Sequence, residues 1–239
     1  MSKQAGGADD PSVQAVVKQV LEMIKDGSKV GLGSGRASAA FIDELGKRVK
    51  AGLKITGVPT SEASSKQAKT LGIPLVELTE DLELDLTVDG ADEVSPHLDM
   101  IKGWGGALVR ERIVAEASKK QIILVGPEKL VDSLGSRGRI PVEVIPLAEG
   151  YVKRKLKSVG MIPTVRLDKD GKKPFITDNG CLTLDCKLET PLKDAKAARA
   201  LEQKVLSFAG VVDTGMFLGT CEQVLVGNPD GTVKVLKRK

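Results

Sequence analysis

The sequence predicts an α/β fold: a mostly parallel sheet with helices on both faces, joined to a smaller α+β domain with antiparallel strands. In the first half of the chain, short apolar segments alternate with segments whose apolar residues recur at helical spacing. Strands that alternate with helices form parallel sheets that are covered on both faces. After Gly135, short strands follow one another across turns such as Asp178-Asn179-Gly180, which is typical of antiparallel hairpins.

The first half opens with a predicted helix that Asp10 caps, Pro11 begins and Gly27 ends. A strand over residues 29–32 runs into a glycine-rich turn, which leads into a helix over 37–50. Further strands are predicted over 53–58, 73–78, 84–88 and 121–125, and further helices over 61–71 and 104–119.

The second half begins with a polar linker at 136–139. Helices are predicted over 148–159 and 194–208, and strands over 140–145, 165–167, 175–177, 181–187, 211–216, 223–226 and 232–236. We therefore expect a first domain over 1–135, completed by the C-terminal segment 221–239, and a small α+β domain over 136–220.

The composition is that of a globular protein with a mixed surface. Apolar residues make up 41% of the 239 residues, charged residues make up 28%, and the 36 basic and 32 acidic side chains are spread along the chain. A nucleic-acid binder would more often cluster its basic residues on one face, so we expect no nucleic-acid partner. No apolar run is long enough to span a membrane, and the polar segment 1–9 has no signal-peptide core. We therefore expect no membrane partner and a cytoplasmic location.

The three cysteines do not form a disulfide framework. Cys181 and Cys186 lie an odd number of positions apart, so on a single strand they would face opposite sides. The sequence has no CxxC pair and no Cys/His zinc spacing, and unpaired cysteines suggest a reducing compartment.

The glycine-rich turn, from Gly31 to Arg36, is a candidate phosphate site. Arg36 stands at the third glycine of the dinucleotide pattern GxGxxG, and no Gly-Lys-Ser/Thr occurs, so neither nucleotide fingerprint is complete. Glycines still let backbone N–H groups approach an anion, and the helix N-terminus adds partial positive charge. Arg36 adds a possible bidentate clamp. The alternative is a tight turn that needs glycine for backbone reasons alone.

Asp89 and Asp92 follow the carboxyl end of a predicted parallel strand, the edge at which open α/β sheets bind ligands. Two close carboxylates suit acid/base work or hydrogen bonds to hydroxyl groups. They could also bind a metal, but no histidine or third carboxylate is placed to complete such a site. The alternative is that both residues cap backbone turns.

Lys102 and Glu111 lie on either side of a glycine-rich helix start at 103–106. The neighbours of Glu111 three and four positions away are all apolar: Ala107, Leu108, Val114 and Ala115. A glutamate on an apolar stripe is either paired in a core or is a general base with a raised pKa. The spacing leaves both possibilities open.

His97, the only histidine, follows Pro96 in a loop, and we expect it to be an exposed loop residue. With one histidine, no GxSxG elbow and no suitably placed cysteine, a hydrolytic triad is not expected. The candidate chemistry therefore belongs to carboxylates and lysine.

Taken in order, these segments resemble type A ribose-5-phosphate isomerase over nearly the whole chain. The matching stretches are the glycine loop with AAFIDELG, SEASSKQAKTLGIPL, DLTVDGADE, MIKG, GALVRERI, PEKLVDSLG, PVEVIP and TDNGCLTLDC. The resemblance implies a Rossmann-like catalytic domain with a smaller α/β domain, assembled as a homodimer or homotetramer. It also implies interconversion of ribose 5-phosphate and ribulose 5-phosphate, in the non-oxidative pentose phosphate pathway, without metal or organic cofactor.

The resemblance implies a role for each candidate residue. Glu111 would be the general base that moves a proton between C1 and C2 through a cis-enediolate, and Lys102 would stabilise the enediolate oxygen. Asp89 and Asp92 would bind hydroxyls and assist ring opening, and Lys129 would lie near the substrate. The other implied substrate contacts are Ser34, Gly35, Arg36, Ala37, Gly90, Ala91, Gly103, Trp104 and Gly105.

Two departures from the family pattern concern the pocket. The family usually has Gly-Thr-Gly-Ser-Thr where this chain has Gly33-Ser34-Gly35-Arg36-Ala37, so two hydroxyl donors are replaced and a guanidinium is gained. Trp104 stands where glycine is common, which could reshape the pocket or change which sugar phosphate fits. The alternatives are therefore an isomerase or deaminase for another phosphosugar, or a non-catalytic sugar-phosphate sensor. The sequence has no helix-turn-helix signal for a sensor.

Overall fold

The computed structural model describes residues 10–192 and 194–238, and the chain divides into two compact units. The first unit comprises Met1–Ala91, Arg110–Lys129 and Thr220–Lys239, and the second comprises Asp92–Val109 and Leu130–Gly219. The polar segment 1–9 lies outside the described residues. The domain boundaries expected from the sequence placed 92–109 with the first domain, and that division stays a prediction.

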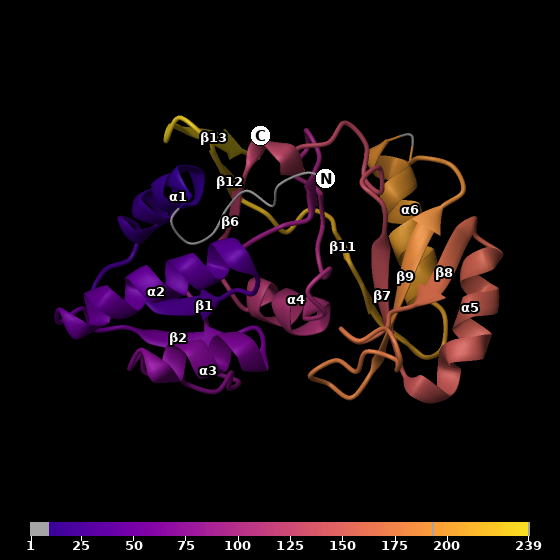
Figure 1. Cartoon of the computed structure of the whole chain (residues 1–239), viewed down its shortest axis with the longest axis horizontal. Helices are drawn as coiled ribbons and strands as arrows, with labels where there is room; N and C mark the ends of the chain where they lie inside the picture. The colour runs from indigo at the N-terminus through magenta and orange to yellow at the C-terminus, as the bar shows by residue number, and fades with distance from the viewer. Residues whose placement is uncertain (1–9, 193, 239) are drawn as a thin grey trace. The chain divides into compact units, whose positions relative to one another are not determined.

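The first unit is built on a six-stranded sheet in the order β13-β12-β6-β3-β1-β2 (Figure 1). Its strands are β1 (Lys29–Leu32), β2 (Thr56–Pro59), β3 (Leu86–Asp89), β6 (Gln121–Val125), β12 (Gln223–Gly227) and β13 (Val233–Lys237). The β12–β13 pair is antiparallel and all the other neighbours are parallel. The mostly parallel sheet predicted from the alternating pattern is thus confirmed.

Helices cover both faces of this sheet. They are α1 (Pro11–Leu21), α2 (Arg36–Lys50), α3 (Glu62–Thr70) and α4 (Leu108–Glu116). Val30 and Leu32 of β1 belong to the core that α1 and α2 cover. Gly31, between them, faces the opposite side, where a Cβ would lie 2.7 Å from Cγ1 of Val114 in α4. The period-two alternation of β1 therefore separates the two helical layers.

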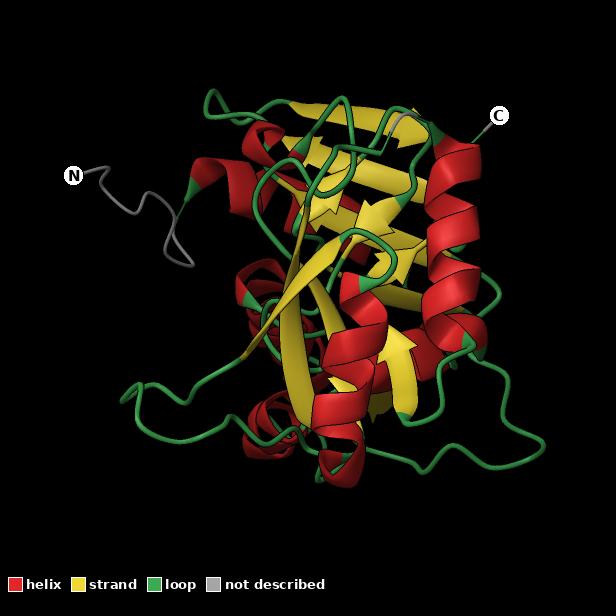
Figure 2. Cartoon of the chain, turned by 90° about the vertical axis from the view of Figure 1, so that its right-hand side faces the viewer, coloured by secondary structure: helices red, strands yellow, loops and turns green. Residues whose placement is uncertain are grey.

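The second unit contains two small antiparallel sheets, in the orders β10-β7-β9-β8 and β11-β5-β4. The strands are β4 (Glu93–Val94), β5 (Met100–Ile101), β7 (Ile140–Val144), β8 (Met161–Val165), β9 (Leu182–Leu188), β10 (Val211–Thr214) and β11 (Met216–Phe217). Helices α5 (Glu149–Lys157) and α6 (Ala195–Leu206) pack on one face of the larger sheet, and Figure 2 shows two helices in front of strands from this side. Single-turn 3₁₀ helices lie at Pro127–Lys129 in the first unit and Pro146–Ala148 in the second.

The larger sheet of the second unit has one apolar and one polar face. Alternate residues of β7, such as Val142 and Val144, join the apolar core with Leu184 of β9. Glu143 and Thr183, which pair in register on the same strands, are fully buried on the other face. The helices therefore cover only one side, and polar side chains fill the other.

Four predicted elements differ from the structure. The helix expected over 104–119 begins only at Leu108, because Gly103 and Gly106 have φ values of 92° and 90° and form a turn before it. The strand expected over 73–78 is wrong, since this stretch makes only one bridge, between Gly57 and Leu75. The strands at 165–167 and 175–177 are also wrong, and the real partner of β9 is Met161–Val165.

In the described part of the chain, no helix combines the length and the apolar character that crossing a membrane requires.

Glu93 of the short strand β4 is the buried acid that ties this strand to the segment after Gly135. Its two carboxylate oxygens accept the N–H groups of Gly135 (2.6 Å) and Arg137 (2.7 Å). Desolvation raises the pKa of Glu93, and the two N–H donors oppose that rise. Glu93 therefore has a structural role in the second unit.

We predict that Glu93→Ala lowers the free energy of unfolding by about 2–4 kcal/mol, because the N–H groups of Gly135 and Arg137 lose their shared acceptor. Urea unfolding measures the change, with Glu77→Ala, an exposed glutamate, as the control. Since the pKa is raised, the carboxyl stabilises the fold fully below its usual value of 4.5, and this contribution is lost as pH rises through the raised pKa. The stability advantage of wild type over Glu93→Gln should therefore shrink as pH rises, and an advantage that grows with pH would contradict this assignment.

Candidate active site

The sheet of the first unit has its topological switch point between β1 and β3. The chain leaves β1 through α2 to reach β2 on one side, whereas β3 pairs with β1 on the other side. Ligands of open α/β sheets bind outside the carboxyl ends of the strands at such a point. The glycine loop follows β1 and Asp89 ends β3, so two of the predicted motifs lie at this edge.

Asp89 is fully buried, and one of its oxygens holds the glycine loop. Its Oδ1 accepts the N–H of Ser34 (3.0 Å), the hydroxyl of Ser38 (3.1 Å) and the N–H of Gly90 (2.7 Å). Hydrogen bonds from three donors compensate for the cost of burying a carboxylate. The Ser34 N–H, which we expected to face a phosphate, is therefore directed at Asp89.

Gly33 is required because of this carboxylate. A Cβ at Gly33 would lie 2.3 Å from Oδ1 of Asp89, closer than any ordinary contact. Gly35 has a φ of 91° and forms the N-cap of α2 without a side-chain cap. The first backbone N–H groups of a helix have no intrahelical partner, so this helix start is suited to an anion.

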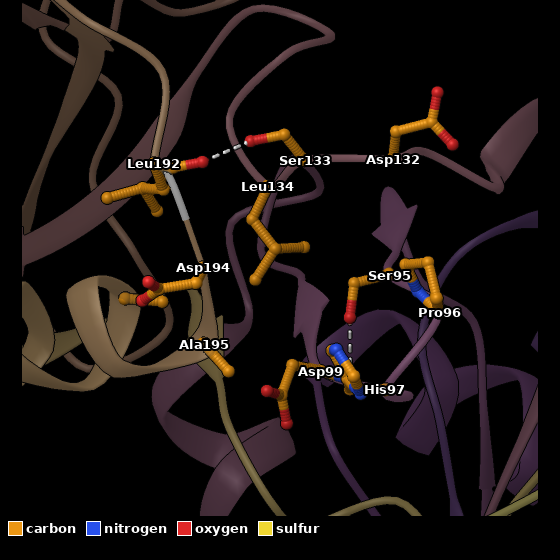
Figure 3. A pocket seen from close by; sticks show the side chains of 11 residues that line it. Ser95, Pro96, His97, Asp99, Asp132, Ser133, Leu134, Leu192, Asp194 and Ala195 are labelled. Carbon is orange, nitrogen blue, oxygen red and sulfur yellow. Dashed lines mark hydrogen bonds between the residues drawn. The ribbon is translucent and has the colours of Figure 1, made fainter.

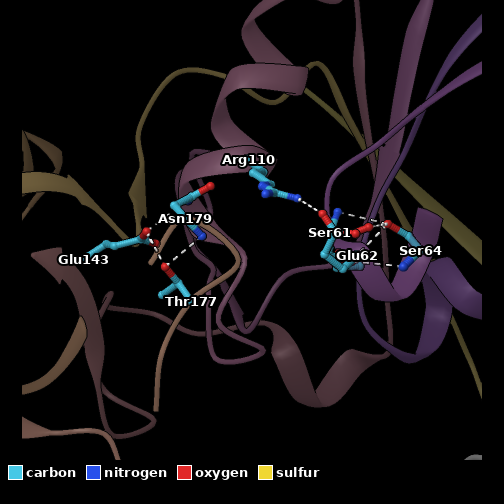
Figure 4. Close-up of polar contacts among 8 residues, drawn as sticks. Ser61, Glu62, Ser64, Arg110, Glu143, Thr177 and Asn179 are labelled. Atoms are coloured by element: carbon cyan, nitrogen blue, oxygen red, sulfur yellow. Dashed lines mark hydrogen bonds and ion pairs between the residues drawn. The ribbon is translucent and has the colours of Figure 1, made fainter. Parts of the chain in front are cut away.

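The hydroxyl of Ser34 extends the loop towards α3. It lies 2.8 Å from the hydroxyl oxygens of both Thr60 and Ser61. Ser61 is the N-cap of α3 and forms a reciprocal capping box with Ser64 (Figure 4). The loop is therefore held from two sides, by Asp89 and by a chain of hydroxyls.

The remaining candidates of the first unit lie on the neighbouring strand and on α4. Lys129 is half-buried at the end of the 3₁₀ helix that follows β6, the strand next to β3. Glu111 lies in the first turn of α4 and its side chain is buried, at 5% exposure. A helix between parallel strands runs antiparallel to them, so its first turn lies towards their carboxyl edge. Next to Glu111, Arg110 points outwards and pairs with Glu62 at 2.8 Å (Figure 4).

Asp92 and Lys102 belong to the second unit. Oδ2 of Asp92 accepts the N–H of Trp104 at 2.9 Å, which ties this acid to the glycine turn. Lys102 is 2% exposed, and its Nζ lies 5.4 Å from the ring centre of Phe217. Its backbone N–H donates to the carbonyl of Gly215 at 2.9 Å. A lysine and an aspartate predicted to be catalytic are thus both fixed next to the same turn.

The indole of Trp104 is held within the second unit. Its N–H donates to the carbonyl of Arg139 at 2.9 Å, and the guanidinium groups of Arg137 and Arg139 lie 5.9 and 5.2 Å from the ring. The ring also packs against the apolar core of this unit. The tryptophan that stands here in place of the family's common glycine is therefore held by contacts with Arg137 and Arg139.

His97 is exposed and lines a pocket of about 160 Å³ in the second unit (Figure 3). Asp99, also on the wall, accepts the N–H of Gly219 and is buried, whereas Asp194 caps α6. Among the described residues, no group of three or more His, Cys, Asp or Glu side chains is arranged to hold a metal ion. Asp99 and Asp194 of this pocket therefore have structural partners.

Some functional neighbours escaped the sequence analysis. Ser38 donates to Asp89 across 51 positions of sequence, and Thr60 contacts Ser34 of the predicted loop across 26, so no local pattern indicates either contact. Arg166 donates to the carbonyls of Gly103 and Trp104 from more than sixty positions away. The only local signal was Ser38, whose place in the first turn of the helix after the glycine loop is suited to a hydrogen bond near the site.

A glycine loop bonded to a buried aspartate at the switch point of a parallel sheet is typical of α/β proteins that bind an anionic ligand at this edge. The family model described as ribose 5-phosphate isomerase A (phosphoriboisomerase A) matches residues 56–231. The chain belongs to the ribose-5-phosphate isomerase A family.

Relatives support this membership over nearly the full length. Ribose-5-phosphate isomerase A 1 of Oceanobacillus iheyensis is 40% identical over 222 residues, which cover 92% of this chain and 96% of that protein. The ribose 5-phosphate isomerase A structure from Methanocaldococcus jannaschii has 38% identity and a TM-score of 0.88, covering 97% of this chain and 100% of that one. A D-ribose-5-phosphate isomerase in complex with phospho-erythronic acid has 35% identity and a TM-score of 0.89, covering 95% and 98%.

We predict that Gly33→Ala displaces the Asp89 carboxylate, lowers stability by about 1–3 kcal/mol through the lost hydrogen bonds, and reduces activity strongly. The matched control is Gly150→Ala in α5, where a Cβ meets nothing within 4 Å. That change should leave activity intact and stabilise the helix by about 0.5–1 kcal/mol. Thermal unfolding and turnover of both variants measure the effects, and equal behaviour of the two would refute the role of Gly33.

Proposed function

We propose that this chain catalyses the aldose–ketose isomerisation of ribose 5-phosphate to ribulose 5-phosphate. Its membership of the family supports the reaction, and the bonded pair of the glycine loop and Asp89 at the switch point is the structural observation that carries the proposal. The reaction moves one proton between C1 and C2 and one between the oxygens, with no net change in oxidation state.

The phosphate group is proposed to bind at the start of α2. The backbone N–H groups of the first turn and the partial positive charge of the helix attract an anion, and Arg36 at the first helical position adds a guanidinium. Lys129 supplies a second cation at the same edge of the sheet. The departure at Arg36 thus replaces the hydroxyl donors of the family by a charged donor.

The proton transfer is proposed to use Glu111. Its carboxylate is buried on an apolar stripe, and a desolvated carboxylate is a suitable base for a carbon acid. Lys102 would stabilise the developing enediolate oxygen, because a cation that is already held in place stabilises charge without reorganisation. Asp89 and Asp92 would bind hydroxyls and assist ring opening, and the described bonds keep both carboxylates in one orientation.

The remaining substrate contacts are proposed on the two loops. Gly90 and Ala91 follow Asp89, and Gly103 and Gly105 enclose Trp104, so backbone groups there are candidates for sugar hydroxyls. No metal or organic cofactor is assigned a role. Assembly as a homodimer or homotetramer and the cytoplasmic location stay predictions.

Incubation of the purified protein with ribose 5-phosphate, in the presence of a chelator, tests the proposal by ketose formation. Five- and six-carbon sugar phosphates should be compared in the same assay, since preference for another sugar would favour the alternative of a different phosphosugar. Phospho-erythronic acid, which a relative binds, should inhibit competitively. Absence of turnover on every sugar, with binding retained, would instead support a sensor.

We predict that Glu111→Gln reduces kcat about 10²-fold or more, because the general base is lost. Glu116→Gln, an exposed glutamate on the same helix, is the matched control and should have normal turnover. Steady-state kinetics on ribose 5-phosphate measure both. A Glu111→Gln enzyme of near-normal activity would rule out the assigned role.

We predict that Arg36→Met raises KM about tenfold with a smaller change in kcat, because a charge-assisted hydrogen bond to phosphate contributes similarly to bound ground and transition states. Lys50→Met removes an exposed cation from the opposite end of α2 and serves as control. The effect of Arg36 should diminish at high salt. An unchanged KM in Arg36→Met would place the phosphate elsewhere.

A further inference from the structure

Arg166 of the second unit is a guanidinium with only 9% of its side chain exposed, lying between the larger sheet and the glycine turn that follows Lys102. On one side, its Nε donates to Oδ2 of Asp185 (3.0 Å) and its Nη2 to Oδ1 (2.5 Å). On the other side, its Nη1 donates to the carbonyl oxygens of Gly103 (3.0 Å) and Trp104 (3.1 Å). One side chain therefore connects a carboxylate of β9 with two consecutive carbonyls of the turn.

The backbone of Arg166 is hydrogen-bonded on both sides, as its guanidinium group is. The residue directly follows β8, its N–H donates to the carbonyl of Thr183 (2.8 Å), and its own carbonyl accepts the N–H of Phe175 (2.8 Å). The bidentate contact with Asp185 uses the planar fork of the guanidinium, which a lysine lacks. Lysine could reach the carboxylate or the carbonyls, but it cannot bind both in this geometry.

The turn that Arg166 binds has little freedom of shape. Gly103 has a φ of 92°, and a Cβ there would lie 2.6 Å from Cβ of Leu108. Gly106 has a φ of 90°, and a Cβ there would lie 2.5 Å from the ring of Phe175. Both glycines are therefore required by backbone conformation and by packing, so the position of the turn follows from what holds its carbonyls.

This turn is connected directly to two residues of the proposed chemistry. One peptide unit joins Gly103 to Trp104. Its carbonyl accepts a bond from Arg166, and its N–H donates to Oδ2 of Asp92. Lys102 precedes Gly103, and its own N–H is anchored to the carbonyl of Gly215. The backbone of Lys102 is therefore held by the bond to Gly215, and the turn that follows it is held by the bonds from Arg166.

We propose that Arg166, held by Asp185, is a positioning residue of the isomerase, which sets the Gly103–Trp104 turn and through it orients Lys102 and Asp92. The proposal rests on the proposed function for the roles of Lys102 and Asp92. A buried ion pair is in itself weak evidence for stability. Here the pair with Asp185 orients the Arg166 guanidinium so that its Nη1 reaches the carbonyls of both Gly103 and Trp104.

The test compares Arg166→Lys with Arg139→Lys. Both arginines contact Asp185, Arg139 through Nη1 at 3.2 Å, but only the side chain of Arg166 reaches the turn carbonyls. Arg166→Lys should lower kcat about 10- to 100-fold, because a small misplacement of catalytic groups has effects of this size. KM should change by less, since the phosphate is held by the first unit. Arg139→Lys keeps a cation near the Trp104 ring and leaves both carbonyl bonds of the turn in place, so kcat should stay within about twofold of wild type.

A second variant keeps the test valid if Arg166→Lys folds poorly. The double variant Arg166→Met/Asp185→Leu removes both charges together, and replacing a buried pair by apolar groups often preserves stability. It should be folded and have the same loss of kcat. In an Arg166→Ala enzyme, added guanidinium should restore part of the lost kcat, whereas an equal concentration of sodium chloride should not.

Three results would overturn the proposal: unchanged kcat in folded Arg166→Lys, equal losses in Arg166→Lys and Arg139→Lys, or no rescue of folded Arg166→Ala by guanidinium. If the proposed function itself is wrong, the wild-type protein will lack turnover, which separates that failure from failure of the positioning role. Trp104, the only tryptophan, reports on the turn without any activity. Acrylamide should quench its fluorescence more strongly in Arg166→Lys than in wild type, and unchanged quenching would show that the turn does not depend on Arg166.

Discussion

The buried carboxylate of Asp89 is the interaction on which the candidate site depends. It ends β3 at the switch point, and its Oδ1 collects donors from the loop after β1, from the first turns of α2 and from the residue that follows it. A buried carboxylate without donors would be expensive, so the loop and the acid stabilise each other. Gly33 follows from the same contact, since its Cα lies where any side chain would meet Oδ1. The loop is thus shaped by a carboxylate before any phosphate is considered.

Local patterns were sufficient to predict the mostly parallel sheet of the first unit and the presence of the helices, but not the short strands β4 and β5 of the second unit. The apolar strand before Asp89 predicted that this acid lies at the carboxyl edge of the sheet. The apolar neighbours of Glu111 indicated a buried glutamate, and Glu111 is buried. Contacts that join distant parts of the chain could not be predicted. Ser34 was expected to offer its N–H to a phosphate, yet that group donates to a residue 55 positions away. Nothing in the sequence around either residue specifies this pairing.

The glycine turn after Lys102 shows why helix boundaries also escaped prediction. The sequence holds a turn signal here, the dipeptide Gly105-Gly106, but the helical spacing of the apolar residues favoured an earlier helix start at Trp104. The left-handed conformations of Gly103 and Gly106 delay the helix to Leu108. The Gly103 carbonyl accepts the Gly106 N–H within this turn, and Arg166 donates to the carbonyls of Gly103 and Trp104. A residue far along the chain therefore contacts the turn that precedes α4.

The proposed catalytic residues from Asp89 to Glu111 are close together in the sequence, although they belong to both compact units. The chain crosses from one unit to the other twice within this stretch. One passage lies between Ala91 and Asp92, the other between Val109 and Arg110. Asp89 lies three residues before Asp92, and Glu111 is the second residue after the other passage. Every proposed acid is thus within three residues of a passage, and each is anchored to its own unit by burial or by a hydrogen bond. Asp89 and Asp92 are therefore each oriented by bonds within their own unit, although only three positions separate them in the sequence.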